Sequence, residues 1–226
     1  MLVVQIAYNI VWSIVLLLSV PIGYLWFPLA LTLLVRVGHC TSLSFDDSVN
    51  RIKELQGPTI LCVSHEYKCL DGWNMATMLL SCPGTFSLLL EDEVPNRIFV
   101  SQFNLHRTRQ GVVPLRIHFV RRKGGQHTVK KLVADVAQGY SPILFLRSDK
   151  RNKMGVYHVV QQYHEVQQTQ IPVLTVRMGP TRAMFSEKPW FMPIGYSMRT
   201  VATPYVYDLK MGSDAFNQGL FDQLLN

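Results

Sequence analysis

The sequence predicts an α/β fold: a single domain with a mixed, mostly parallel central sheet flanked by helices, preceded by an N-terminal apolar helical membrane anchor. From residue 59 onward, apolar strand-like runs alternate with helical stretches, which is the pattern of βαβ units. The run 142–146 is almost wholly apolar, as expected for a central strand covered on both faces. Residues 1–35 carry no charged side chain, and this predicts the anchor.

We expect residues 1–38 to form the anchor and residues 39–226 to form one α/β domain, because 226 residues suffice for little more than one sizeable domain. A straight helix over the whole apolar segment would extend about 50 Å, beyond the roughly 30 Å of a hydrocarbon core. Helix-breaking residues interrupt it, so we expect one kinked or two short helices: Pro21, Gly23 and Pro28. A cleaved signal peptide is disfavoured, because no Lys or Arg precedes the long apolar core. The alternative is a helical pair buried in a soluble fold.

The charge balance points to anionic partners. The chain has 22 Lys and Arg against 15 Asp and Glu, a net charge of +7. A basic domain behind an apolar segment favours an anionic membrane surface or a phosphorylated ligand. Arg36 directly follows the apolar segment, so we expect the α/β domain on the cytoplasmic face of a membrane. The four cysteines lack zinc spacing and lie in or beside apolar runs, which predicts reduced, buried thiols.

Local signals predict the elements of the domain. The expected helices are 44–56, 73–80, 126–138 and one beginning near Val156, with a short helical end from Asp214. The stretch 126–138 has regular amphipathic spacing, with Gly139 as its stop. The expected strands are 59–64, 85–90, 115–120, 142–146 and 171–176, and two further β-rich runs cover 194–198 and 201–207.

His65 comes directly after the first of these strands, and Asp71 follows it six positions later. Open α/β sheets place their chemistry at the carboxyl ends of buried strands. A histidine at this position can act as a general base, and the aspartate can orient it through the other ring nitrogen. The pattern therefore predicts a catalytic pair, His65 and Asp71. The alternative is a His–Asp pair with a structural role.

The stretch 94–134 contains nine Lys or Arg residues and no Asp or Glu. Arg121, Arg122 and Lys123 would leave the strand 115–120 at the sheet edge that also carries His65, where guanidinium groups can bind a phosphate bidentately. A solvated face and a nucleic-acid surface are the alternatives. We expect no nucleic acid, because the basic residues are spread over a buried strand and an amphipathic helix. We expect no metal either, since His158 and His164 point to different faces of one helix.

Four ordered stretches resemble the sequence blocks of the lysophospholipid (1-acylglycerol-3-phosphate) acyltransferase family. The first, Ser64-His65 through Asp71, resembles an Asn-His-x-Ser-x-x-Asp block, and Phe119-Val120-Arg121-Arg122 is similar to a block ending in Phe-Ile-x-Arg. The stretch from Phe145 through Arg151 stands in the place of Phe-Pro-Glu-Gly-Thr-Arg. The fourth, Ile171-Pro172-Val173-Leu174-Thr175, resembles Val-Pro-Val-Val-Pro. The resemblance spans roughly residues 55–207.

This resemblance implies transfer of a fatty acyl group from acyl-CoA or acyl carrier protein to a hydroxyl of a lysophospholipid or a glycerol phosphate. His65 would take the hydroxyl proton, and Asp71 would hold the imidazole tautomer. The basic residues 121–123 would bind the acceptor's phosphate. The acceptor-site loop would contain Arg147, Ser148, Lys150 and Arg151, and Ile171 and Pro172 would form a structural fourth block. Membrane phospholipid is the implied partner, with no cofactor and no obligate protein partner.

Two departures from the family pattern leave a second function open. One residue more separates His65 from Asp71 than in the family, which on a helix rotates a side chain by about 100°. In the third block, Leu146-Arg147-Ser148 replaces Pro-Glu-Gly, so a cation stands in place of a carboxylate. The alternative is therefore a catalytically inactive acyltransferase-like protein that binds phospholipid or phosphate through its basic loops.

Overall fold

The computed structural model describes residues 2–38, 42–45, 47–64, 69–80, 82–120, 126–146, 155–182 and 197–225. The α-helices are α1 (Leu2–Leu25), α2 (Phe27–Thr32), α3 (Ser48–Lys53), α4 (Cys69–Leu79), α5 (Val94–Arg109), α6 (Gln126–Ala137), α7 (Val156–Gln167) and α8 (Ser213–Leu225), and a π-helical segment η1 (Leu33–Gly38) extends α2. The strands are β1 (Ser42–Ser44), β2 (Ile60–Ser64), β3 (Phe86–Glu91), β4 (Arg116–Val120), β5 (Ser141–Leu146), β6 (Val173–Arg182) and β7 (Ser197–Tyr205).

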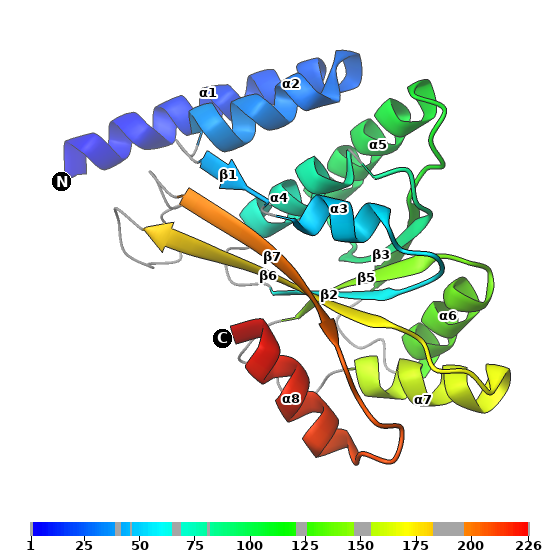
Figure 1. The fold of residues 1–226 in the computed structure, drawn as a ribbon. Helices are drawn as coiled ribbons and strands as arrows, with labels where there is room; N and C mark the ends of the chain where they lie inside the picture. The colour runs from blue at the N-terminus through cyan, green and yellow to red at the C-terminus, as the bar shows by residue number, and fades with distance from the viewer. Residues whose placement is uncertain are drawn as a thin grey trace.

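The strands form one sheet in the order β1-β7-β6-β2-β5-β3-β4 (Figure 1). All neighbouring strands are parallel except β6 and β7, which are antiparallel. The predicted mixed, mostly parallel sheet is therefore confirmed. In β2, Leu61 and Val63 pack into the core on one face, whereas Ile60 and Cys62 pack into the core on the other. Burial on both faces explains why this run is apolar at successive positions.

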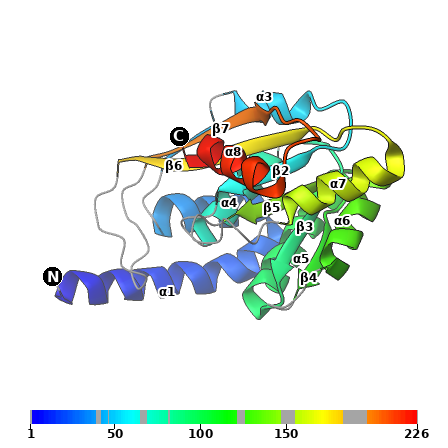
Figure 2. The same cartoon turned by 90° about the horizontal axis from the view of Figure 1, so that it is seen from below.

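Helices cover both faces of the sheet (Figure 2). On one face, α3, α4 and α5 pack on the strands together with the N-terminal helices, whose residues Val15, Phe27 and Leu31 join the same apolar core. On the other face, α6, α7 and α8 form the second core. The N-terminal helices are thus packed on the domain.

Local signals located most elements of the domain, and α6 with its stop at Gly139, where φ is +85°, lies where predicted. The expected helix 44–56 is wrong at its start: residues 42–44 form β1, parallel to β7, and α3 begins at Ser48. The helix expected at 73–80 begins earlier, at Cys69. The strand expected at 171–176 begins at 173 and continues to 182, because antiparallel pairing with β7 extends it.

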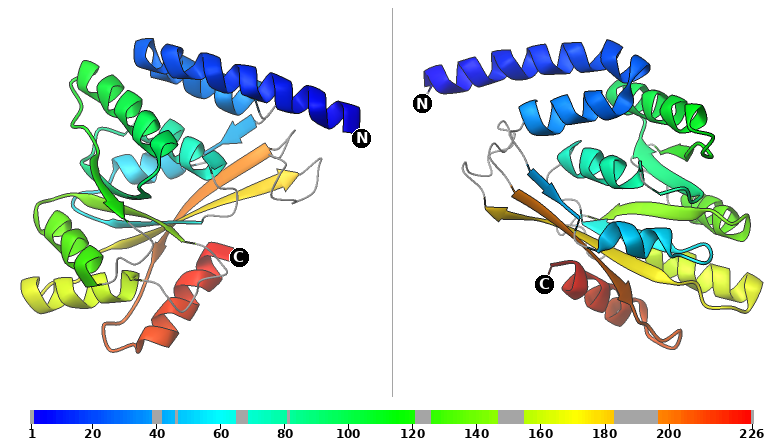
Figure 3. Two further views of the ribbon diagram at one scale, coloured as in Figure 1. Left: turned by 180° about the vertical axis from the view of Figure 1, so that it is seen from behind. Right: turned by 45° about the horizontal axis from the view of Figure 1, so that its top comes forward.

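The N-terminal segment breaks between Gly23 and Pro28, two of the three residues predicted to interrupt it. The single helix α1 continues through Pro21 and Gly23 and ends at Leu25, and the chain turns at Trp26 into α2. Figure 3 shows α1 lying along the outside of the molecule beside α2. Within the described residues, no helix combines the length and the apolar character that crossing a membrane requires.

Polar side chains of α5 hold α1 on the domain. The amide of Gln102 donates a hydrogen bond to the carbonyl of Val20 (2.7 Å), and the guanidinium of Arg109 donates to the carbonyls of Tyr24 (2.8 Å) and Leu25 (3.1 Å). The Arg109 contact places a positive charge at the C-terminus of α1. The helix dipole makes this contact favourable, because its negative end lies there. The carboxyl-terminal half of α1 is therefore attached to α5.

Candidate active site

The carboxyl ends of β2, β5, β3 and β4 lie along one edge of the sheet, because these strands are parallel. The neighbouring strands β2 and β5 end level with each other, since Ser64 pairs with Leu146. After β2 the chain continues to α4 on one face of the sheet, and after β5 it continues to α7 on the other face. This divergence is a topological switch point, the position where open α/β sheets bind ligands.

The predicted site segments begin at this edge. His65 directly follows the last residue of β2 but lies outside the described residues. The basic residues that follow β4 and β5 also lie outside them: Arg121, Arg122, Lys123, Arg147, Ser148, Lys150 and Arg151. The segments after β2 and β5 begin on adjacent strands, about 5 Å apart, and the segment after β4 begins two strands beyond β5, about 10 Å farther.

Asp71 is described, and it is fully buried at 0% exposure. It lies in the first turn of α4, where a negative charge is favourable because of the helix dipole. The helix expected at 73–80 therefore already includes Asp71. Residues 65–68 are all that separates the end of β2 from the start of α4, so Asp71 stays close to the carboxyl end of β2.

A buried polar network, not recognised in the sequence, connects α4 to β7. Asn74 lies one turn after Asp71 and is also 0% exposed. Its Nδ2 donates a hydrogen bond to Oγ1 of Thr200 (3.0 Å), which is likewise 0% exposed. On the other side, Oγ of Ser48 donates to the Thr200 carbonyl (2.8 Å) and accepts from the Ala202 amide (2.9 Å). The sequence signal was an asparagine at a helical position facing the core.

A second side-chain contact joins the carboxyl end of β2 to β6. The hydroxyl of Ser64 accepts a hydrogen bond from the backbone amide of Met178 (2.7 Å) and donates to the Met178 carbonyl (3.3 Å). These bonds continue the β2–β6 pairing past its last backbone partners, Val63 and Val176. The backbone that leads into His65 is therefore held against β6.

Four arginines of the basic stretch are used within the fold. Arg107 is 1% exposed and donates four hydrogen bonds, to the carbonyls of Val113, Leu79, Cys82 and Gly84. Burial lowers the pKa of this guanidinium.

The other three arginines bind neighbouring elements: Arg97 pairs with Asp92 (2.6 Å), Arg116 pairs with Asp135 (3.0 Å), and Arg109 binds α1. Cations already engaged in this way contribute little to a nucleic-acid surface. Four of the nine basic residues of the stretch 94–134 therefore have structural roles.

A second His–Asp pair joins β4 to α6. Nε2 of His118 lies 2.6 Å from Oδ2 of Asp135, whose other oxygen accepts from Arg116. Arg116 also donates to Gln138 (2.6 Å) and lies over the ring of Tyr140 at 3.8 Å. Asp135 lies near the C-terminal end of α6, at the amino side of the sheet, far along the helix from the carboxyl edge. We interpret this cluster as a structural brace for the edge strand.

The other described histidines lie apart from one another. His158 and His164 are both on α7, as predicted, and His106 on α5 faces the ring of Phe27 at 6.2 Å. Burial, with a smaller effect of Arg109, lowers the pKa of His106. In the part of the chain that the structure describes, no three metal-ligating side chains come together.

The predicted fourth block lies away from the switch point. Ile171 and Pro172 precede β6, so they lie at the amino edge of the sheet, opposite to the end of β2. The Pro172 carbonyl accepts a hydrogen bond from the Ile60 amide (2.9 Å), and the Ile171 carbonyl accepts one from the Tyr207 hydroxyl. These contacts align β6 with β2.

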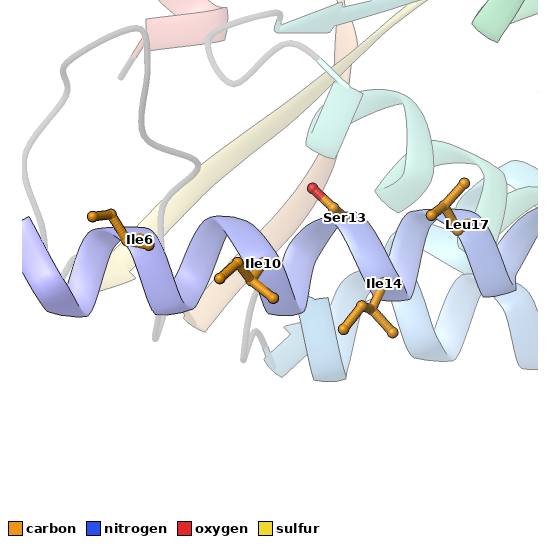
Figure 4. Close-up of a pocket in the computed structure, with 5 residues that line it drawn as sticks. All are labelled: Ile6, Ile10, Ser13, Ile14 and Leu17. Atoms are coloured by element: carbon orange, nitrogen blue, oxygen red, sulfur yellow. The ribbon is translucent and has the colours of Figure 1, made fainter.

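An open apolar groove runs along α1. Its lining residues recur at helical spacing on one side of the helix: Ile6, Ile10, Ser13, Ile14 and Leu17 (Figure 4). Val15 and Ser19 are buried, whereas Ile10, Ile14 and Leu17 are 51–73% exposed. The helix α1 is therefore apolar on its exposed side as well as on its buried side.

Comparison with models of known protein families and a search of the curated proteins both find no match to this chain.

Proposed function

We propose that this protein is a membrane-associated acyltransferase. It moves a fatty acyl group from acyl-CoA or acyl carrier protein to a hydroxyl of a lysophospholipid or a glycerol phosphate. The observation that carries this proposal is the switch point between β2 and β5, with the buried Asp71 beside the segment that holds His65. The order of the four sequence stretches, which resemble the family's blocks, supports the reaction class.

The proposed chemistry uses His65 as the base and the Asp71 carboxylate to orient its ring. Neutral His65 takes the proton of the acceptor hydroxyl while that oxygen bonds to the thioester carbonyl carbon. The tetrahedral intermediate then expels the thiolate by breaking the C–S bond, and the imidazolium returns the proton to the sulfur. Asp71 orients the ring and stabilises the imidazolium. Because Asp71 is removed from water, its charge acts more strongly on a nearby cation than it would at the surface.

The basic segments account for the acceptor. A lysophospholipid or glycerol phosphate carries a phosphate near its hydroxyl, and Arg121, Arg122 and Lys123 would bind it. Arg147, Ser148, Lys150 and Arg151 would line the same site from β5. Since the four structural arginines are occupied elsewhere, these two segments carry the phosphate-binding role in this proposal.

Membrane association rests on the surface of α1. The helix presents exposed apolar residues over its length, from Ile6 (50% exposed) to Leu25 (78% exposed), and Trp26 at the following turn is 60% exposed. Helices of this kind lie in the bilayer interface with their apolar side in the acyl region. The anchor would then lie along the membrane surface, held by α5, with the α/β domain on the cytoplasmic face.

The decisive experiment measures thiol release from an acyl-CoA by the purified full-length chain in phospholipid vesicles, with a panel of lysophospholipid acceptors. We expect His65→Ala to lower kcat by about 100- to 10,000-fold, the range for loss of a general base. His164→Ala is the matched control, because His164 lies in the last turn of α7, at the end of the helix away from the segment that follows β5.

Unchanged turnover in His65→Ala would refute the assigned base. If the wild-type chain binds lysophospholipid vesicles but releases no thiol with any acceptor, the inactive homologue that binds phospholipid or phosphate is the correct function. In that case Arg122→Ala weakens vesicle binding.

A further inference from the structure

Asp71 and Asn74 share one buried face of α4. They are three residues apart in the helix, a spacing that puts their β-carbons about 5–6 Å from each other. Both side chains have no exposed surface. Any rotation or sliding of α4 that moves Asn74 therefore moves the Asp71 carboxylate by a similar amount.

Asn74 provides a directional contact between α4 and the sheet. Trp73, Met75, Met78 and Leu79 bury α4 through apolar contacts, which favour burial without selecting one orientation. The hydrogen bond from Asn74 Nδ2 to Thr200 Oγ1, by contrast, requires a definite distance and angle. It joins residues 126 positions apart, on the first helix after the site and on β7.

Thr200 is itself firmly held. Beyond Arg199, β7 has no β1 residue paired beside it, and Ser48 takes that place by bonding to the Thr200 carbonyl and the Ala202 amide. β6 holds the other side of β7, where Thr200 pairs with Met178, the residue that Ser64 also binds. The acceptor atom for Asn74 thus belongs to a rigid strand.

Burial of Asn74 is unfavourable for stability if its role is packing alone. Its Oδ1 is buried and, among the described residues, finds no hydrogen-bond donor. Rotating the amide by 180° would leave Nδ2 without an acceptor instead. A buried unsatisfied polar atom costs about 1–3 kcal/mol, which a leucine of similar size would avoid.

We propose that Asn74 is a positioning residue of the acyl-transfer centre: its bond to Thr200 fixes the rotation of α4 and thereby the place of the Asp71 carboxylate on the sheet, on which its action on His65 depends. This inference rests on the proposed function. A displacement of about 1 Å in such a pair lowers a rate on the order of a hundredfold. The bond also keeps Asp71 in one place despite the additional residue between His65 and Asp71.

The test uses the full-length chain and separates stability from positioning. Asn74→Leu removes the amide, and Asn74→Leu/Thr200→Val replaces both partners by apolar groups of similar shape, which is close to neutral for stability. Thr77→Val is the control, because the Thr77 hydroxyl donates its hydrogen bond to the Trp73 carbonyl, within its own helix. For each variant the unfolding midpoint, the thiol-release rate and the NMR titration of the His65 ring are measured. His65→Ala assigns the resonance, and Asp71→Asn gives the titration without the carboxylate.

We expect the double variant to unfold within a few degrees of the wild type, while its His65 titration moves at least halfway to that of Asp71→Asn. Its kcat falls on the order of a hundredfold, with the acceptor KM little changed. A double variant with wild-type stability and a wild-type His65 titration overturns the inference and leaves the proposed function standing. If Asp71→Asn itself leaves the titration unchanged, the His65–Asp71 pair is refuted, and the positioning role with it. The titration decides between these outcomes even without turnover.

Discussion

The exposed side of α1 makes a quantitative prediction about membrane binding. Ile10 is 55% exposed and Leu17 is 73% exposed, on the side of the helix away from the buried Val15. Complete burial of an Ile or Leu side chain contributes about 1.5–3 kcal/mol, so a bilayer that covers both exposed portions gains about 2–4 kcal/mol. We therefore expect Ile10→Ser/Leu17→Ser to weaken vesicle binding by roughly 30- to 700-fold.

The assay is co-sedimentation of the full-length chain with neutral phosphatidylcholine vesicles, repeated at low and high salt. Neutral lipid isolates the apolar contribution, which salt does not screen. The matched control is Val166→Ser, because Val166 is 67% exposed on α7 and lies on the other side of the sheet. Undiminished binding of the double variant, or binding that disappears with salt, would refute the apolar attachment of α1.

Three further predictions concern the fold. Replacing Arg107 by Met removes a donor from four carbonyls, those of Leu79 and Cys82 in buried contacts, and should lower the free energy of unfolding by about 2 kcal/mol or more in urea titrations, with Arg107→Lys intermediate. Asp135→Asn should destabilise the chain by about 2 kcal/mol and speed amide exchange in β4, whereas Lys131→Gln should change neither. Burial raises the pKa of the Cys82 thiol from 9.0 to about 11. The stability that comes from keeping this thiol protonated is therefore fully present below pH 9 and is lost as the pH rises through 11. Cys82→Ala should flatten that part of the curve of unfolding free energy against pH.

Local sequence patterns located the central strands well. The runs that became β2 and β5 are short, apolar at successive positions and bounded by turn residues, so the burial that shapes them is visible in the sequence itself. The same holds for α6, because its amphipathic spacing and Gly139 together mark one helix and its end.

Elements that depend on distant partners were not predictable in this way. β1 is three residues long and exists because β7 pairs with it across 155 positions, as with Ser42 and Ser197. α5 was missed because its buried side includes Gln102 and Arg107, polar residues that are satisfied only by carbonyls from other elements. No local pattern marks a buried arginine as a core residue.

The sequence by itself determined which segments carry reactive and basic groups, because strand ends and charges are local properties. Only the tertiary structure decided that β2 and β5 are neighbours with connections to opposite faces, since strand order is set by contacts between distant residues. The same is true of the link from Asn74 to Thr200 and Ser48, which a helix pattern cannot reveal. Nonlocal packing selects strand order and buried hydrogen-bond partners together, because each must leave every apolar face covered and almost every buried polar group paired.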